Sequence, residues 1–136
     1  MISTISQPLL LRLLKIYYIY LYKNGKGVYS HMKIQCQKSD LLNSVNIVLK
    51  AVPAKSTMPI LECLIIESTS LGIKLIANDM ELGIETMVKG NILEEGTVAL
   101  NAKVFSEIVR RLPENEVSIY TDENYMTEII CEKAKF

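Results

Sequence analysis

The stretch STMPILECLIIE, residues 56–67, is a proline-containing loop that runs directly into an apolar segment. The apolar residues predict a β-strand over residues 61–69. Two further β-rich runs follow at residues 71–77 and 80–90. Ser, Gly, Asn and Asp occupy the two junctions, and these residue types favour tight turns. The region therefore predicts strands joined as hairpins.

Two helices are expected on either side of these hairpins. Residues 39–52 have apolar side chains at helical spacing, with Ser39 as the expected N-cap and Pro53 as the stop. Asn101 opens a second helix over residues 103–112, and a proline follows it. The side chains of this second helix that we expect to face inward are Val104, Phe105, Ile108, Val109 and Leu112.

Four more segments have the character of strands. They are residues 32–37, 96–101, 116–122 and 125–132. The resulting order is β-α-β-β-β-β-α-β-β. This order predicts an α+β fold in which two helices pack on one face of an antiparallel sheet.

The first 31 residues differ from the rest of the chain. They carry four Lys and Arg and no Asp or Glu, whereas residues 32–136 have a net charge of −4. The leader (residues 1–31) is open to three interpretations: a membrane-surface or membrane-spanning segment at residues 8–22, a signal peptide, or upstream sequence outside the folded domain. We expect the domain to begin at Met32, and we leave the leader out of the fold prediction.

Catalytic chemistry has little support in this sequence. The one histidine, His31, lies in the leader, and the three cysteines have no zinc-like spacing. They indicate reduced thiols of a cytoplasmic protein. Asp79 and Glu81 are conceivable metal ligands of a nuclease, but acids beside turns are usually solvated. The sequence contains no glycine-rich phosphate loop. We therefore expect no catalytic residue, no metal, no cofactor and no small-molecule substrate.

Three stretches carry a family resemblance. They are STMPILECLIIE, then IANDMELGIE (residues 76–85), then AKVFSEIVRRLPENEVSI (residues 102–119). Together with the opening Met32-Lys33-Ile34, their order resembles the amino-terminal domain of the bacterial sliding clamp, the beta subunit of DNA polymerase III. The resemblance covers residues 32–136 and implies a non-catalytic processivity factor that encircles double-stranded DNA.

Charge is distributed in a way that suits this resemblance. Residues 38–55 and 101–112 have a net charge of +4, while the rest of residues 32–136 has −8. Phosphate contacts hold DNA of any sequence and exchange readily with counterions, as sliding requires. An acidic domain with cationic helices would accept DNA along those helices alone.

The resemblance implies particular DNA contacts. Lys55 matches a basic loop position of the family, and Lys103 matches a basic position at the start of its second helix. Arg110 follows Lys103 by seven residues, hence on the same helix face. Lys50 and Arg111 are further candidates. The alternative is that all five are solvated charges on the outer faces of amphipathic helices.

The chain departs from the family pattern in length. Clamp subunits contain three such domains, and two subunits close around DNA; this chain has one domain with an incomplete last strand. Complete clamps also bind the polymerase III core and the clamp loader, through a pocket in a domain absent here. Phe136 matches an aromatic position at the subunit interface, and the strand at residues 125–132 is expected to have an unpaired edge. The sequence thus predicts a clamp fragment, with a small membrane-associated protein anchored by residues 8–22 as the alternative.

Overall fold

We analysed a computed structural model, which describes residues 2–5, 31–55, 59–79, 82–124 and 126–136. Its helices are α2 (Lys38–Val48) and α3 (Ala102–Arg111), with short 3-10 helices η1 (Leu49–Ala51) and η2 (Pro59–Glu62). Its strands are β1 (Ile2–Ile5), β2 (Met32–Gln37), β3 (Cys63–Thr69), β4 (Gly72–Asn78), β5 (Gly83–Val88), β6 (Gly90–Glu94), β7 (Gly96–Asn101), β8 (Glu116–Thr121), β9 (Thr127–Cys131) and β10 (Ala134–Lys135).

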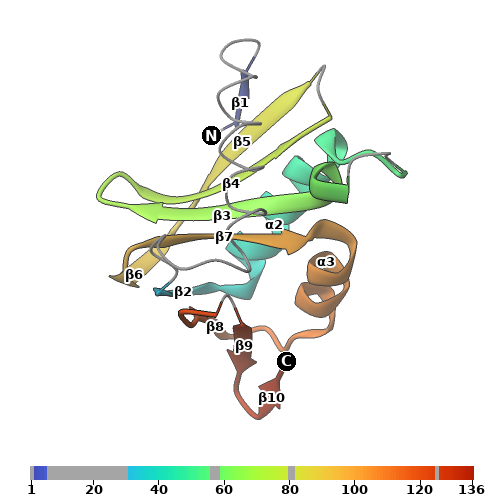
Figure 1. Ribbon diagram of the computed structural model, residues 1–136. Helices are drawn as coiled ribbons and strands as arrows, with labels where there is room; N and C mark the ends of the chain where they lie inside the picture. The colour runs from blue at the N-terminus through green and yellow to red at the C-terminus, as the bar shows by residue number, and fades with distance from the viewer. Residues whose placement is uncertain (1, 6–30, 56–58, 80–81, 125) are drawn as a thin grey trace.

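The strands form two antiparallel sheets (Figure 1). Sheet A has the order β1-β5-β4-β3-β7, and sheet B has the order β10-β9-β8-β2-β6. Helix α2 packs against β5, β4 and β2, and α3 packs against β7, β3 and α2. One hydrophobic core joins both sheets to both helices. The α+β class predicted from the sequence is confirmed, but the strands divide between two sheets where one was expected.

Sheet B has an edge strand, β6, that the sequence did not predict. Strand β6 pairs with β2, with Cys36 opposite Gly90. A Cβ at Gly90 would lie 2.4 Å from the carbonyl oxygen of Gln35, so only glycine permits this approach. The exposed side chains of β6 include Asn91, Leu93 and Glu94. Such a segment lacks the alternation by which strands are recognised in a sequence.

Three local predictions are corrected by tertiary contacts. Helix α2 starts at Lys38 with Gln37 as its N-cap, because the Lys38 N–H donates to the carbonyl oxygen of Asn115 at 3.0 Å. The expected Ser39 cap was therefore wrong by two residues. Val104 of α3 is 54% exposed, whereas it was expected to face inward.

The third correction concerns the last strand. The edge at residues 125–132 was expected to be unpaired, but β10 pairs with β9, and Phe136 exchanges two 2.8 Å backbone hydrogen bonds with Ile129. The strand that ends the chain thus covers part of this edge.

The leader contributes one described element. Residues 2–5 form β1, which pairs with β5 at the edge of sheet A, a strand that the sequence analysis did not include. The proposed membrane or signal segment at residues 8–22 lies outside the described residues. Within the described part, no helix is long and apolar enough to cross a bilayer. The division of the chain at residue 31 stays a prediction.

None of the three cysteines, which all lie in the described part of the chain, forms a disulfide. Cys36 and Cys131 are buried in the core, and Cys63 is half-buried at the start of β3. Burial raises the pKa of the Cys36 thiol to about 12, with a smaller contribution from Asp40. A thiol with so high a pKa is protonated at neutral pH and is a poor nucleophile.

Candidate DNA-contacting surface

Helix α3 begins with a side-chain cap and carries its cations outward. The Asn101 Oδ1 accepts a hydrogen bond from the Val104 N–H at 3.0 Å, as the sequence predicted for a helix opened by Asn101. Lys103 is exposed in the first turn, and no acidic residue accompanies it there. A cation near a helix N-terminus opposes the helix dipole. Lys103 therefore does not serve the stability of α3.

Arg110 links the outer face of α3 to the outer face of α2. Its guanidinium Nη2 donates to the Asn46 Oδ1 at 3.2 Å, and both residues are exposed. Arg110 lies two helical turns from Lys103 and so shares its stripe on α3. Asn46 is on the exposed face of α2, with Lys50 at the end of that face. The two helices thus present one continuous outer surface.

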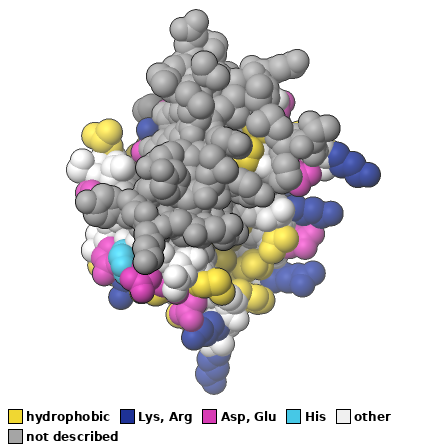
Figure 2. All heavy atoms as spheres, in the orientation of Figure 1, with side chains coloured by type: hydrophobic (Ala, Val, Ile, Leu, Met, Phe, Trp, Pro, Cys, Tyr) yellow, Lys and Arg dark blue, Asp and Glu magenta, His cyan; other side chains and the backbone are white. Residues whose placement is uncertain are grey.

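The two helices run in opposite directions. The start of α2 lies beside the end of α3, because the Lys38 N–H bonds to Asn115 and the Lys38 Nζ lies 3.1 Å from Glu114. This arrangement places Lys103, at the start of α3, toward the end of α2, where Lys50 follows in η1. Lys55 follows Lys50 by five residues and is exposed. In Figure 2, Lys and Arg side chains lie along the right-hand edge of the molecule, beside α3 and the loop after η1.

Lys38 was counted with the cationic helices but does not belong to their outer surface. Its side chain is buried, and the residue is 8% exposed. Its Nζ donates to the Arg110 carbonyl oxygen at 3.4 Å and pairs with Glu114. It therefore joins the start of α2 to the end of α3 and is not part of their exposed outer surface.

The five predicted contact residues differ in their surroundings. Arg111 lies a quarter turn from Arg110, on the stripe of Val104 and away from α2. The described residues form three ion pairs, Lys38–Glu114, Lys74–Glu85 and Lys135–Glu128, and none uses a predicted contact residue. The surface that joins α2 and α3 therefore carries Lys103, Arg110 and Lys50, with Lys55 beyond its end.

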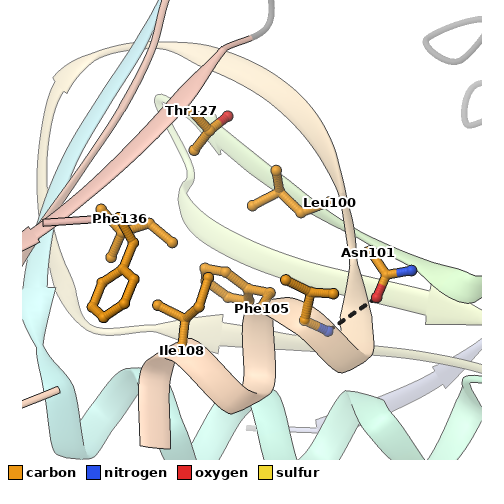
Figure 3. A pocket seen from close by; sticks show the side chains of 8 residues that line it. Leu100, Asn101, Phe105, Ile108, Thr127 and Phe136 are labelled. Atoms are coloured by element: carbon orange, nitrogen blue, oxygen red, sulfur yellow. Dashed lines mark hydrogen bonds between the residues drawn. The ribbon is translucent and has the colours of Figure 1, made fainter. Parts of the chain in front are cut away.

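A second feature, the apolar groove, lies between α3 and the end of the chain (Figure 3). It has a volume of about 180 Å³ and is open to solvent. The side chains of Phe105, Ile108 and Phe136 converge on it. Phe136 is 51% exposed, so its ring is available to a further protein surface. Of these residues, only Phe136 was predicted from the sequence to lie at an interface. The other lining residues are Leu100, Asn101, Val104, Thr127 and Ile129.

The described residues contain no cluster of side chains that could hold the metal ion of a nuclease. No three His, Cys, Asp or Glu side chains of this part of the chain gather as a metal ion would require. Asp79 accepts a hydrogen bond from the Leu82 N–H at 2.7 Å and so closes a turn. Its supposed partner Glu81 lies outside the described residues.

Two antiparallel sheets that share a core with a pair of antiparallel, outward-cationic helices define a domain of the DNA-clamp type. The comparisons with known proteins agree. Residues 32–136 match the family model of the DNA polymerase III beta subunit, N-terminal domain. The chain belongs to this family.

Individual relatives are beta sliding clamps. That of Bacillus subtilis (strain 168) is 36% identical over 113 residues, which cover 77% of this chain and 30% of that protein. That of Halalkalibacterium halodurans is 36% identical over 96 residues, 65% of this chain and 25% of the relative. The chain therefore spans less than a third of the length of these relatives.

Solved structures show the same fold. A DNA polymerase III beta subunit from Eubacterium rectale has a TM-score of 0.76 and 60% identity, over 77% of this chain and 28% of that one. The Bacillus subtilis clamp has a TM-score of 0.75 and 36% identity, over 79% of this chain and 30% of the other.

Proposed function

We propose that this chain is the amino-terminal domain of a beta sliding clamp and that it contributes part of the DNA-facing wall of the ring. The whole clamp would encircle duplex DNA and tether a replicative polymerase without catalysing a reaction. Its partners would be double-stranded DNA, a second beta subunit, the polymerase III core and the clamp loader. The protein would act in the cytoplasm.

One observation carries the DNA-contacting part of this proposal. The bond between Arg110 and Asn46 makes a single surface of α2 and α3, and that surface carries cations without ion-pair partners among the described residues. Unpaired surface cations attract phosphate of any sequence. Glu107 lies between Lys103 and Arg110 on the same stripe, which limits how tightly any one phosphate is held.

The contact with a second subunit would use the apolar groove. Phe136 and Val104 are both more than half exposed there, although both are apolar. Exposed aromatic and aliphatic side chains beside a groove are typical of protein interfaces. The membrane alternative has no support in the comparisons, and residues 8–22 lie outside the described residues.

The salt dependence of DNA binding tests the proposal. Each phosphate contact steepens the negative slope of log affinity against log salt by about 0.9 on duplex DNA, so the loss of a contact makes the slope shallower by that amount. Neutralising Lys103 and Arg110 together, as Lys103→Gln and Arg110→Gln, should therefore reduce the slope by about 2 without changing sequence preference. Fluorescence anisotropy with a labelled 30-base-pair duplex measures this.

The matched control is the charge pair Lys133→Gln and Lys135→Gln. Both residues are exposed near β10, away from α2. These substitutions should leave the slope nearly unchanged. Equal effects of the two pairs would show a diffuse attraction to net charge and would refute the proposed surface. In a complete clamp, Lys55→Ala or Lys103→Ala should also shorten retention on nicked circular DNA.

A further inference from the structure

Arg110 contacts α2 at two places, although it belongs to α3. Its carbonyl oxygen accepts a 3.4 Å hydrogen bond from the Nζ of Lys38, the first residue of α2. Its guanidinium Nη2 donates to the Oδ1 of Asn46 at 3.2 Å, and Asn46 lies about two turns after Lys38 along α2. The side chain of Arg110 is therefore held along the boundary between the two helices, on their exposed side.

The partner of this guanidinium is a neutral amide. A guanidinium only donates hydrogen bonds, so the Asn46 oxygen is the atom that accepts. An amide oxygen fixes the direction of the guanidinium and leaves its positive charge uncancelled, whereas a carboxylate at the same position would form an ion pair with it. The fork of N–H donors on the Arg110 side chain also suits the oxygens of a phosphate group.

Three lysines of the described part of the chain have carboxylate partners instead. They are Lys38 with Glu114, Lys74 with Glu85, and Lys135 with Glu128. Lys38 shows what such a pair does at the boundary of the helices, since it is buried and joins α2 to α3. Arg110 has an amide at the same boundary. A charge that is held in place but not cancelled can act on a ligand.

The face of α2 around Asn46 suits an anionic ligand. Its exposed stripe continues into η1 and consists of Ser39, Asn43, Asn46 and Lys50, which follow one another at intervals of three or four residues. None of the four is acidic, although residues 32–136 have a net charge of −4. The acid of α2, Asp40, is half-buried and lies about a quarter turn from this stripe.

We propose that Asn46 is a positioning residue for DNA binding: it holds the Arg110 guanidinium on the surface shared by α2 and α3 without cancelling its charge. The inference rests on the proposed function, because it takes duplex phosphate as the ligand. Asn46 acts through Arg110 and needs no phosphate contact of its own. A long side chain that is already ordered loses less conformational entropy when it binds.

Variants of Asn46 test this more cleanly than variants of Arg110. Arg110 lies in the last turn of α3, where a cation also interacts favourably with the helix dipole, so its removal mixes two effects. Asn46→Ala leaves Arg110 in place but unheld. It should weaken binding of the labelled 30-base-pair duplex about threefold through the entropy of the freed side chain, with an unchanged salt slope because no charge is lost. In an Arg110→Gln background, Asn46→Ala should have no further effect.

Asn46→Asp separates a role in DNA binding from a purely structural one. The new carboxylate would hold the same guanidinium more strongly, so the midpoint of urea unfolding should not fall. It would also cancel the charge of Arg110, so the salt slope should become shallower by about 1, as for the loss of one phosphate contact. Asn46→Gln keeps an amide oxygen and should retain most of the affinity. Parental affinity and slope in Asn46→Asp overturn the proposal, because a purely structural role predicts them.

Two controls measure the effect of added negative charge alone. Asn124→Asp adds the charge in the exposed turn between β8 and β9 and should leave the slope unchanged. Asn43→Asp adds it about one turn before Asn46 on the same stripe and should change the slope less than Asn46→Asp does. Equal slopes for Asn43→Asp and Asn46→Asp overturn the proposal, because the effect would then come from charge on the surface and not from the contact with Arg110.

The same measurements distinguish failure of this inference from failure of the proposed function. If Arg110→Gln makes the slope shallower but Asn46→Ala weakens binding equally with and without Arg110, then Arg110 contacts DNA and Asn46 does not position it. That result overturns this inference alone. If Lys103→Gln together with Arg110→Gln leaves the slope unchanged, the proposed surface does not contact DNA, and both proposals fail.

Discussion

Replacing Lys38 with methionine should lower the stability of the domain and leave DNA binding intact. Lys38 is one of the six cations of residues 38–55 and 101–112, so a count of charges gives it the same role as Lys103. The structure instead buries it between α2 and α3, with Glu114 and the Arg110 carbonyl as partners. The Lys38→Met variant separates these two roles.

The size of the effect follows from the contacts. The side chain of Glu114 is 69% exposed. A pair with so exposed a partner contributes at most about 1 kcal/mol. The 3.4 Å hydrogen bond to Arg110 is long and adds about 0.5 kcal/mol at the negative end of the α3 dipole. Methionine keeps the buried stem, so Lys38→Met should cost about 1 kcal/mol, whereas Lys38→Ala should cost about 2 kcal/mol.

Urea unfolding followed by circular dichroism measures the stability, and the duplex anisotropy assay measures the salt slope. Glu114→Gln removes the ion pair alone and should cost less than Lys38→Met. The reasoning is refuted if Lys38→Met reduces the salt slope by about 1, as Lys103→Gln should, because Lys38 would then contact phosphate.

Three further predictions concern single residues. Asn101→Ala removes the α3 cap and should cost about 1 kcal/mol in urea unfolding, while Asn101→Asp should restore most of it; equal losses would contradict the capping role. The pKa of Cys36 is raised to about 12 in the folded state, so its contribution to stability is complete below pH 9 and is lost as pH rises from 9 to 12. The free energy of unfolding of the parent protein should therefore fall by about 1 kcal/mol between pH 8 and pH 10 relative to that of Cys36→Ala. Parallel curves of unfolding free energy against pH for the two proteins would contradict this. In a complete clamp that contains this domain, Phe136→Ser should raise the dimer dissociation constant about tenfold or more in sedimentation equilibrium, whereas Ile130→Ser, on the opposite face of β9, should not.

The local features of the fold could be read from the sequence because local rules determine them. Turn-prone residues at the junctions 70–72 and 78–79 correctly separated β3, β4 and β5. Asn101 was correctly placed at the start of α3, since its side chain caps a backbone N–H three residues away. Family motifs identified the domain, and the match over residues 32–136 confirmed it.

Contacts between distant residues decided the remainder. Ser39 is a good cap by composition, but the Asn115 carbonyl accepts from the Lys38 N–H, so the helix starts earlier. Gly90 starts a strand of sheet B only because β2 lies close enough to exclude a Cβ. In both contacts, Lys38 with Asn115 and Gly90 with Gln35, the two residues are far apart in the sequence. A periodic pattern of residues therefore cannot predict them.

Sequence by itself determined the two helices and most of the strands in their order, the α+β class and the excess of cations on the helices, because spacing and residue type act within one or two turns of chain. Tertiary structure alone decided what each cation does. Burial beside Glu114 makes Lys38 a structural cation, and the bond to Asn46 places Arg110 on a surface shared by two helices. The physical reason is that a charge acts through its neighbours and its exposure, and packing sets both.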